Sequence, residues 1–213
     1  MRKLFMAILM LFGGEGICQD GIKVACVGNS ITQGPGRSHP ESYPMQLQEI
    51  LGEEYLVKNF GVSGSTLLKS GDKPYWEEPQ FEMSKNFDAD ILILKLGTND
   101  TKPQNWKFHE DFKKDYIDLV ETFKASMKET SQLYICFPVP IFQDNWGITS
   151  SILENEIIPI LKEVAEITGV LTIDLHKEMS EKSSLFPDGI HPDKEGNRVM
   201  AEKISSHILK KHL

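Results

Sequence analysis

The chain has 213 residues, of which 40% are hydrophobic and 25% are charged, proportions that are ordinary for a soluble globular protein. Its formal net charge of −8 argues against nucleic acid or an anionic membrane surface as the main partner. The length suits one domain with a full hydrophobic core, and no internal repeat, linker or low-complexity segment divides the sequence.

The first residues have the pattern of a secretory signal. Two basic residues precede an apolar run of roughly ten residues, and the small residues Gly16 and Cys18 occupy the positions that favour cleavage. The apolar run is too short to cross a bilayer, and the residues just before Cys18 do not resemble a lipoprotein signal. We therefore predict a signal peptide over residues 1–18 and a single mature domain over residues 19–213, secreted or periplasmic and without a membrane anchor. A buried N-terminal helix is the alternative.

The rest of the sequence alternates between short apolar runs, which predict buried strands, and longer segments with helical periodicity. The predicted strands cover residues 22–27, 56–60, 91–96, 133–137 and 170–175. The predicted helices cover residues 42–51, 108–128, 152–167 and 193–211, with a kink or a late start at Pro159. Strands joined by helical crossovers form parallel sheets that are covered on both faces. The expected fold is therefore a three-layer α/β/α sandwich with a five-stranded parallel sheet.

Three residues inside these strands differ from their apolar neighbours in chemistry. Lys95 interrupts the clearest strand near its end, and we expect its amine to reach toward an acidic side chain at the rim of the sheet. Cys26 and Cys136 lie in strands that are not expected to be neighbours. Because a disulfide needs Cα atoms within about 7 Å, both are predicted to be free, buried thiols.

Residues with useful chemistry follow four of the predicted strands, at the edge where open α/β sheets place their functional groups. They are Gly28-Asn29-Ser30 after the first strand, Gly61 to Gly64 after the second, Gly97 to Asp100 after the third, and Asp188 to Pro192 beyond the fifth. Each group taken alone has the composition of an ordinary turn or helix cap. Four such groups at one edge of a sheet favour a functional site.

Together the four groups fit acyl transfer. The hydroxyl of Ser30 is a weak nucleophile that needs a base, which His191 can supply. Asp188 lies three residues before His191, a spacing that lets its carboxylate accept the Nδ1 proton and leaves Nε2 for Ser30. Candidate donors to a developing oxyanion are the backbone N–H groups of Ser30 and Gly64 and the side-chain amide of Asn99.

Motifs for other chemistry are missing from the sequence. It contains no dinucleotide-binding Gly-x-Gly-x-x-Gly and no phosphate-binding loop ending in Gly-Lys-Ser or Gly-Lys-Thr. It also contains no His-Glu-x-x-His and no paired Cys-x-x-Cys. We therefore predict an enzyme without a cofactor and without a metal ion.

The sequence resembles the GDSL/SGNH hydrolase family of esterases and lipases over nearly the whole mature chain. Gly-Asn-Ser-Ile-Thr at residues 28–32 is similar to the first block of that family, Gly64 to the second, residues 97–100 to the third and residues 188–192 to the last. Asn29 departs from the family name, which implies Asp at this position, so only the local turn geometry is affected.

The resemblance implies a flavodoxin-like (SGNH hydrolase) strand order and assigns a role to each residue. Ser30 is the nucleophile and one oxyanion donor, Gly64 and Asn99 complete the oxyanion hole, and His191 with Asp188 forms the base. The Gly-Asn-Ser-Ile-Thr and Gly-Thr-Asn-Asp-Thr-Lys-Pro stretches are most similar to bacterial carbohydrate O-acetylesterases.

The residues around the site favour a carbohydrate ester as substrate. Trp76, Trp106 and Trp146 fall in loops after strands, where their faces suit sugar rings, and Arg37 is a candidate partner for a substrate carboxylate. We predict removal of O-acetyl groups from acetylxylan, pectin-type polysaccharides or sialic-acid-bearing glycans. A lysophospholipase or thioesterase-like acylhydrolase, and a non-catalytic glycan-binding protein on an esterase scaffold, are the alternatives.

Overall fold

The computed structural model describes residues 21–210, so the predicted signal peptide lies outside the described residues. Its centre is one parallel sheet with the strand order β2-β1-β3-β4-β5. The strands are β1 (Ile22–Gly28), β2 (Tyr55–Gly61), β3 (Ile91–Lys95), β4 (Gln132–Phe137) and β5 (Leu171–Asp174). The predicted five-stranded parallel sheet and its flavodoxin-like order are confirmed.

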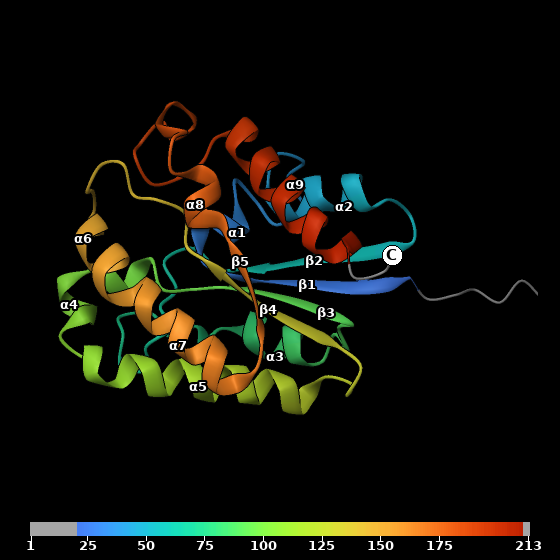
Figure 1. Cartoon of the computed structure of the whole chain (residues 1–213), viewed down its shortest axis with the longest axis horizontal. Helices are drawn as coiled ribbons and strands as arrows, with labels where there is room; N and C mark the ends of the chain where they lie inside the picture. The colour runs from blue at the N-terminus through green and yellow to red at the C-terminus, as the bar shows by residue number, and fades with distance from the viewer. Residues whose placement is uncertain (1–20, 211–213) are drawn as a thin grey trace, which may run out of the picture.

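Helices cover both faces of the sheet (Figure 1). One layer contains α3 (Pro79–Lys85), α5 (His109–Ser126) and α7 (Ile158–Thr168), and the other contains α2 (Tyr43–Leu51), α8 (Leu175–Met179) and α9 (Lys194–Lys210). Shorter helices are α1 (Ser30–Gln33), α4 (Pro103–Trp106) and α6 (Ser150–Ile152), with single turns at Tyr75–Glu77, Asn99–Thr101, Leu153–Ile157 and Ser183–Leu185. Within residues 21–210, no helix has both the length and the apolar content needed to cross a membrane.

The central strand β3 shows why the sheet is buried on both sides. Leu92 and Leu94 belong to the core beneath α5 and α7, whereas Ile91 and Ile93 belong to the core beneath α2 and α9. Successive side chains of a strand point to opposite faces, so an unbroken apolar run supplies both layers. This run is the reason that the fold could be predicted from the sequence.

The helix predicted around Pro159 does not start late. Residues 150–168 form one continuous helical run, made of α6, a wide π-helical turn at Leu153–Ile157 and α7, which begins at Ile158. Pro159 cannot donate a backbone N–H to the preceding turn, and the π-helical turn directly before it, in which the Ile158 N–H bonds to the Leu153 carbonyl, is the local adjustment at this point. Helix α3 lies in a segment for which the sequence indicated no helix.

Lys95 contradicts the expectation of an acidic partner. Its side chain is completely buried on the face that also carries Ile91 and Ile93. Among residues 21–210 its Nζ atom has no hydrogen-bond partner and forms no ion pair. Burial lowers the pKa of Lys95 from 10.5 to about 8, because removal from water penalises the charged amine.

Cys26 and Cys136 are free and buried, as predicted, because β3 separates their strands.

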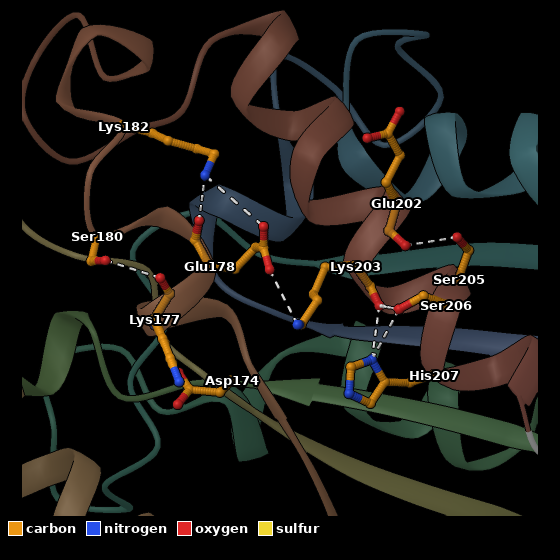
Figure 2. Close-up of polar contacts among 10 residues, drawn as sticks. All are labelled: Asp174, Lys177, Glu178, Ser180, Lys182, Glu202, Lys203, Ser205, Ser206 and His207. Carbon is orange, nitrogen blue, oxygen red and sulfur yellow. Dashed lines mark hydrogen bonds and ion pairs between the residues drawn. The ribbon is translucent and has the colours of Figure 1, made fainter.

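Polar contacts fix the short helix α8 against α9 (Figure 2). The carboxylate of Glu178 in α8 pairs with Lys203 in α9 at 3.1 Å, and Lys182 donates to the Glu178 carbonyl at 2.8 Å. Within α9 the ring of His207 bonds the carbonyl of Lys203 at 2.9 Å. The Glu178–Lys203 pair thus joins the two helices that flank residues 180–193, the connection that carries two of the predicted site residues.

Candidate active site

The first three strands along the sheet end at the same level. Gly28 at the end of β1 pairs with Gly61 at the end of β2 and with Lys95 at the end of β3. The next residue after β2 continues the ladder, because the Val62 N–H donates to the Gly28 carbonyl at 2.9 Å. The loops that follow these strands therefore start side by side at one edge of the sheet.

Ser30 is the first residue of α1, a helix of four residues directly after β1. Asn29 caps this helix, since its side-chain oxygen accepts a hydrogen bond from the Ile31 N–H at 3.1 Å. Asn and Asp are equally good at this capping position. The departure from the family name at Asn29 therefore leaves the turn that presents Ser30 intact.

The structure brings Ser30, His191 and Asp188 together in one chain of hydrogen bonds. The Ser30 Oγ lies 2.9 Å from the Nε2 atom of His191, and the Nδ1 atom of His191 lies 2.8 Å from Asp188 Oδ2. The other carboxylate oxygen of Asp188 accepts the backbone N–H groups of Ile190 at 2.8 Å and His191 at 2.7 Å. A hydroxyl, an imidazole and a carboxylate in this order can activate the hydroxyl as a nucleophile.

The turn around His191 depends on a glycine. Gly189 has φ of +80°, a conformation that residues with side chains rarely adopt, and a Cβ atom there would lie 2.5 Å from the Gln143 Cβ. The close approach is useful, because the Gly189 carbonyl accepts the Phe142 N–H at 2.8 Å. The loop over residues 142–149 is thereby attached to the turn that carries the imidazole.

Asp188 stays ionised more readily than an ordinary aspartate. Partial burial pushes its pKa upward, but the backbone N–H groups of His191 and Ile190 and the ring of His191 stabilise the carboxylate. The net effect is a lowered pKa for Asp188. A carboxylate at this place favours the tautomer of His191 that carries its proton on Nδ1, which leaves Nε2 able to accept the Ser30 proton.

The candidate oxyanion donors come from the loops after β2 and β3. Gly64 has φ of +83°, and the Ser63 N–H before it donates to the side chain of Gln33 in α1 at 2.9 Å. Asn99 is buried, and its Nδ2 donates one hydrogen to the Ser65 carbonyl at 3.1 Å. That bond fixes the amide beside the Gly64 loop and leaves its second hydrogen for another acceptor.

Asp100, to which the sequence assigned no role, joins these two loops. Its fully buried carboxylate accepts the backbone N–H groups of Leu67 at 2.9 Å and Leu68 at 2.8 Å. Burial raises the pKa of Asp100 to about 6, although the hydrogen bonds from Leu68 and Leu67 oppose the rise. The only signal in the sequence was its position directly after Asn99, which does not reveal that the carboxylate would be buried.

A cavity of about 320 Å³ opens beside the Ser30 hydroxyl. Its walls come from α1 and the residues just after it, from the loop after β2, and from the segment that runs from His191 into the start of α9. The lining residues besides Ser30 and His191 are Ile31, Gly34, Pro35, Ser63, Pro192 and Asn197. An acyl group of modest size fits beside the hydroxyl in such a space.

Two of the three predicted substrate-binding tryptophans are used in packing. Trp106 is 8% exposed and donates its indole N–H to Glu156 at 3.1 Å. Trp76 donates to the Leu67 carbonyl at 2.8 Å and is packed between Phe81 and the amine of Lys69. Trp106 is therefore too buried to offer its face to a sugar. Trp76 is only partly buried and does not line the cavity beside Ser30, and its role in substrate binding stays a prediction.

Trp146 is the exception, because its side chain is 58% exposed. Its indole centroid lies 5.6 Å from that of the His191 ring.

Arg37 is half-buried and donates from Nε to the Gly61 carbonyl at 2.8 Å, so it braces the end of β2 and does not line the cavity. Residues 21–210 hold no group of three or more His, Cys, Asp or Glu side chains arranged for a metal ion.

Known structures have the same fold. A carbohydrate acetylesterase from Sinorhizobium meliloti superposes with a TM-score of 0.71 at 19% identity, over 88% of this chain and 98% of that chain. An acetyl xylan esterase superposes with a TM-score of 0.71 at 22% identity, over 88% of this chain and 100% of that chain. At these identities the likeness concerns the fold.

Sequence comparison adds a relative and a family. An acetylxylan esterase from Xylanibacter ruminicola is 38% identical over 209 residues, which covers 89% of this chain and 44% of the relative. The chain thus spans less than half the length of that relative. The model of the GDSL-like lipase/acylhydrolase family matches residues 26–199. Together with the motifs at the edge of the sheet, this match shows that the chain belongs to the GDSL-like lipase/acylhydrolase family.

Proposed function

We propose that this chain is a secreted serine esterase that removes O-acetyl groups from carbohydrates. The observation that carries the proposal is the 2.9 Å distance between Ser30 Oγ and His191 Nε2, two atoms from residues 161 positions apart. The cavity of about 320 Å³ beside Ser30 has room for an acyl group. The acetylxylan esterase of Xylanibacter ruminicola supports a carbohydrate as the alcohol, and the basic and apolar N-terminal residues support export.

In the acylation half of the reaction, His191 Nε2 accepts the proton of the Ser30 hydroxyl while Oγ attacks the carbonyl carbon of the ester. The carbonyl oxygen becomes an oxyanion, for which the Ser30 and Gly64 N–H groups and the Asn99 amide are the proposed donors. When the tetrahedral intermediate collapses, the protonated imidazole gives its proton to the leaving sugar oxygen. The products are the free sugar hydroxyl and an acetyl group bound to Ser30.

In the deacylation half, a water molecule replaces the alcohol. His191 takes one proton of the water, and the hydroxide oxygen attacks the acetyl carbon. The second tetrahedral intermediate then breaks its bond to Oγ. The proton returns to Ser30, and acetic acid leaves as acetate. Asp188 remains a carboxylate throughout and stabilises the imidazolium that forms in both halves.

Release of acetate tests the proposal. The mature protein is incubated with acetylated xylan, acetylated pectin fragments and O-acetyl sialic acid, beside a series of esters with lengthening acyl chains. We expect acetate from at least one carbohydrate and falling rates with longer chains. Faster turnover of long chains would instead indicate a lysophospholipase or thioesterase. A protein that releases nothing and is not labelled by a fluorophosphonate probe would be a glycan-binding protein.

Asp188→Asn tests the role of the carboxylate. The variant can keep the oxygen that accepts the Ile190 and His191 N–H groups, so the turn is retained. An NH₂ group then faces His191 Nδ1 and favours the tautomer that cannot accept the Ser30 proton. We expect kcat for a simple acetate ester to fall by roughly 10⁴-fold with little change in melting temperature. Unchanged turnover would show that Asp188 has only a structural role.

A further inference from the structure

Within the part of the chain that the structure describes, the one aromatic ring that packs on His191 is that of Trp146. Its indole lies 5.6 Å from the imidazole centroid, with the two rings inclined by 49°. The side chain is 58% exposed, whereas the similarly large apolar side chains of the core are almost fully covered. Trp146 therefore contacts the candidate base on one side and presents a free surface on another.

Trp146 is held in an unusual backbone conformation. Its φ is +51°, a value that is uncommon for any residue other than glycine and is an outlier for a bulky one. Such conformations persist only where the surrounding structure imposes them, and they are frequent at functional sites. A hydrophobic residue that is both strained and exposed contributes little to folding, so a role in binding is the more economical explanation.

The loop that carries Trp146 is fixed at both ends and across its middle. The Phe142 N–H donates to Gly189, the Ser150 N–H donates to the Asp144 side chain at 2.9 Å, and the Thr149 N–H donates to the Thr101 hydroxyl at 3.1 Å. In the middle, Asn145 and Ile148 exchange backbone hydrogen bonds. The indole is thus positioned before any ligand arrives, which reduces the entropy lost on binding.

The proton transfer to the leaving group indicates which part of the substrate lies beside the indole. In the proposed reaction, His191 Nε2 gives its proton to the alcohol oxygen, so this oxygen must come within hydrogen-bond distance of the imidazole. Trp146 packs on the same ring but does not line the cavity beside Ser30. The acyl group and the alcohol therefore have separate places, the cavity for the first and the surface beside Trp146 for the second.

We propose that Trp146 is the stacking platform for the sugar ring of the leaving alcohol and thereby determines preference for carbohydrate esters. This inference rests on the proposed esterase function and names its alcohol subsite. A pyranose ring has an apolar face of C–H groups, which packs on an indole, and peripheral hydroxyls that remain in water. A short alcohol such as ethanol is too small to reach from the imidazole across the indole.

The test compares two acetate esters in matched variants. Trp146→Asn removes the ring but keeps a residue that tolerates positive φ, so the loop can retain its shape. We expect the ratio of kcat/KM for an acetylated xylo-oligosaccharide to that for ethyl acetate to fall about tenfold, the effect of one aromatic contact. Trp146→Tyr should restore most of the ratio. Ile167→Ala, which removes another side chain that is 58% exposed, should leave both esters at wild-type rates.

The outcomes separate this inference from the proposed function. Equal losses on both esters would show that the indole only positions His191, and an unaltered ratio would show that it does not touch the sugar. Either result overturns the inference while the esterase remains. A wild-type protein that hydrolyses no carbohydrate ester would overturn the proposed function. In that case binding of the same oligosaccharide to Ser30→Ala, with and without Trp146→Asn, still decides whether the indole is a sugar platform.

Discussion

The Ser30→Ala variant is expected to lose about 10⁵-fold or more in kcat on any acetate ester that the wild-type protein hydrolyses. Without the hydroxyl no covalent acyl intermediate forms, and His191 has no nucleophile to activate. The residual rate comes only from binding and from the oxyanion donors, which act on a water molecule that is poorly placed. His191→Ala should be almost as damaging, because the two side chains act as one unit and their losses do not add.

The fold should tolerate this change. Among residues 21–210 the Ser30 side chain has a single hydrogen bond, to His191, and alanine is well suited to the first turn of α1. We expect thermal unfolding within a degree or two of the wild-type protein. Ser205→Ala in α9, which removes a hydroxyl bonded to Glu202, serves as the matched control with full activity. Persistent turnover by Ser30→Ala, or probe labelling at another residue, would refute the assignment of the nucleophile.

Replacing Lys95 with methionine is expected to stabilise the protein by about 3 kcal/mol near neutral pH. The amine is fully buried without a partner among the described residues, and its pKa falls from 10.5 to about 8. Each unit of pKa corresponds to about 1.4 kcal/mol, so keeping this amine charged in the interior costs roughly 3 kcal/mol. Methionine has a similar length and flexibility and carries no charge.

The dependence on pH provides a sharper measurement. Between about pH 8 and pH 10.5 the unfolded chain holds a proton that Lys95 has already lost in the folded chain, so raising the pH favours the folded state of the wild type. The advantage of Lys95→Met should therefore shrink over this range. Burial raises the pKa of Cys26 and Cys136, so these thiols oppose the trend in both proteins, while the charge of Lys95, which lowers the pKa of Cys136, acts only in the wild type. The quantity to measure is thus the difference between the two urea midpoints at each pH.

An exposed lysine provides the control for Lys95. Lys114→Met removes one positive charge from an exposed position of α5, and its stability relative to the wild type should not change with pH over the same range. If Lys95→Met is less stable than the wild type near pH 7, the amine has a stabilising partner, and burial of an unpaired charge is not what sets its pKa.

The architecture could be predicted because its causes are local in the sequence. The strands are buried on both faces and appear as apolar runs, and the site residues follow directly where these runs end. Their convergence then follows from the parallel arrangement of the strands alone. Gly28, Gly61 and Lys95 end their strands at one level for this reason.

What the sequence did not reveal depends on how loops fold back. Trp76 and Trp106 follow strands as Trp146 does, yet only packing against Phe81 and Phe112 decides that Trp76 is partly buried and Trp106 is buried. The burial of Lys95 depends on how far the covering helices extend over the end of β3, because both faces of this strand lie in a core layer. No local pattern indicates such tertiary contacts.

The hydroxyl and the imidazole meet across 161 positions, and α9, which follows the imidazole, packs against α2. A nascent chain leaving the ribosome therefore carries the nucleophile long before it carries the base. A partly folded chain in which α9 has not yet packed against α2 should therefore have no esterase activity. Recovery of esterase turnover after dilution from denaturant would then report completion of the last long-range docking step, and optical signals from the earlier helices should precede it.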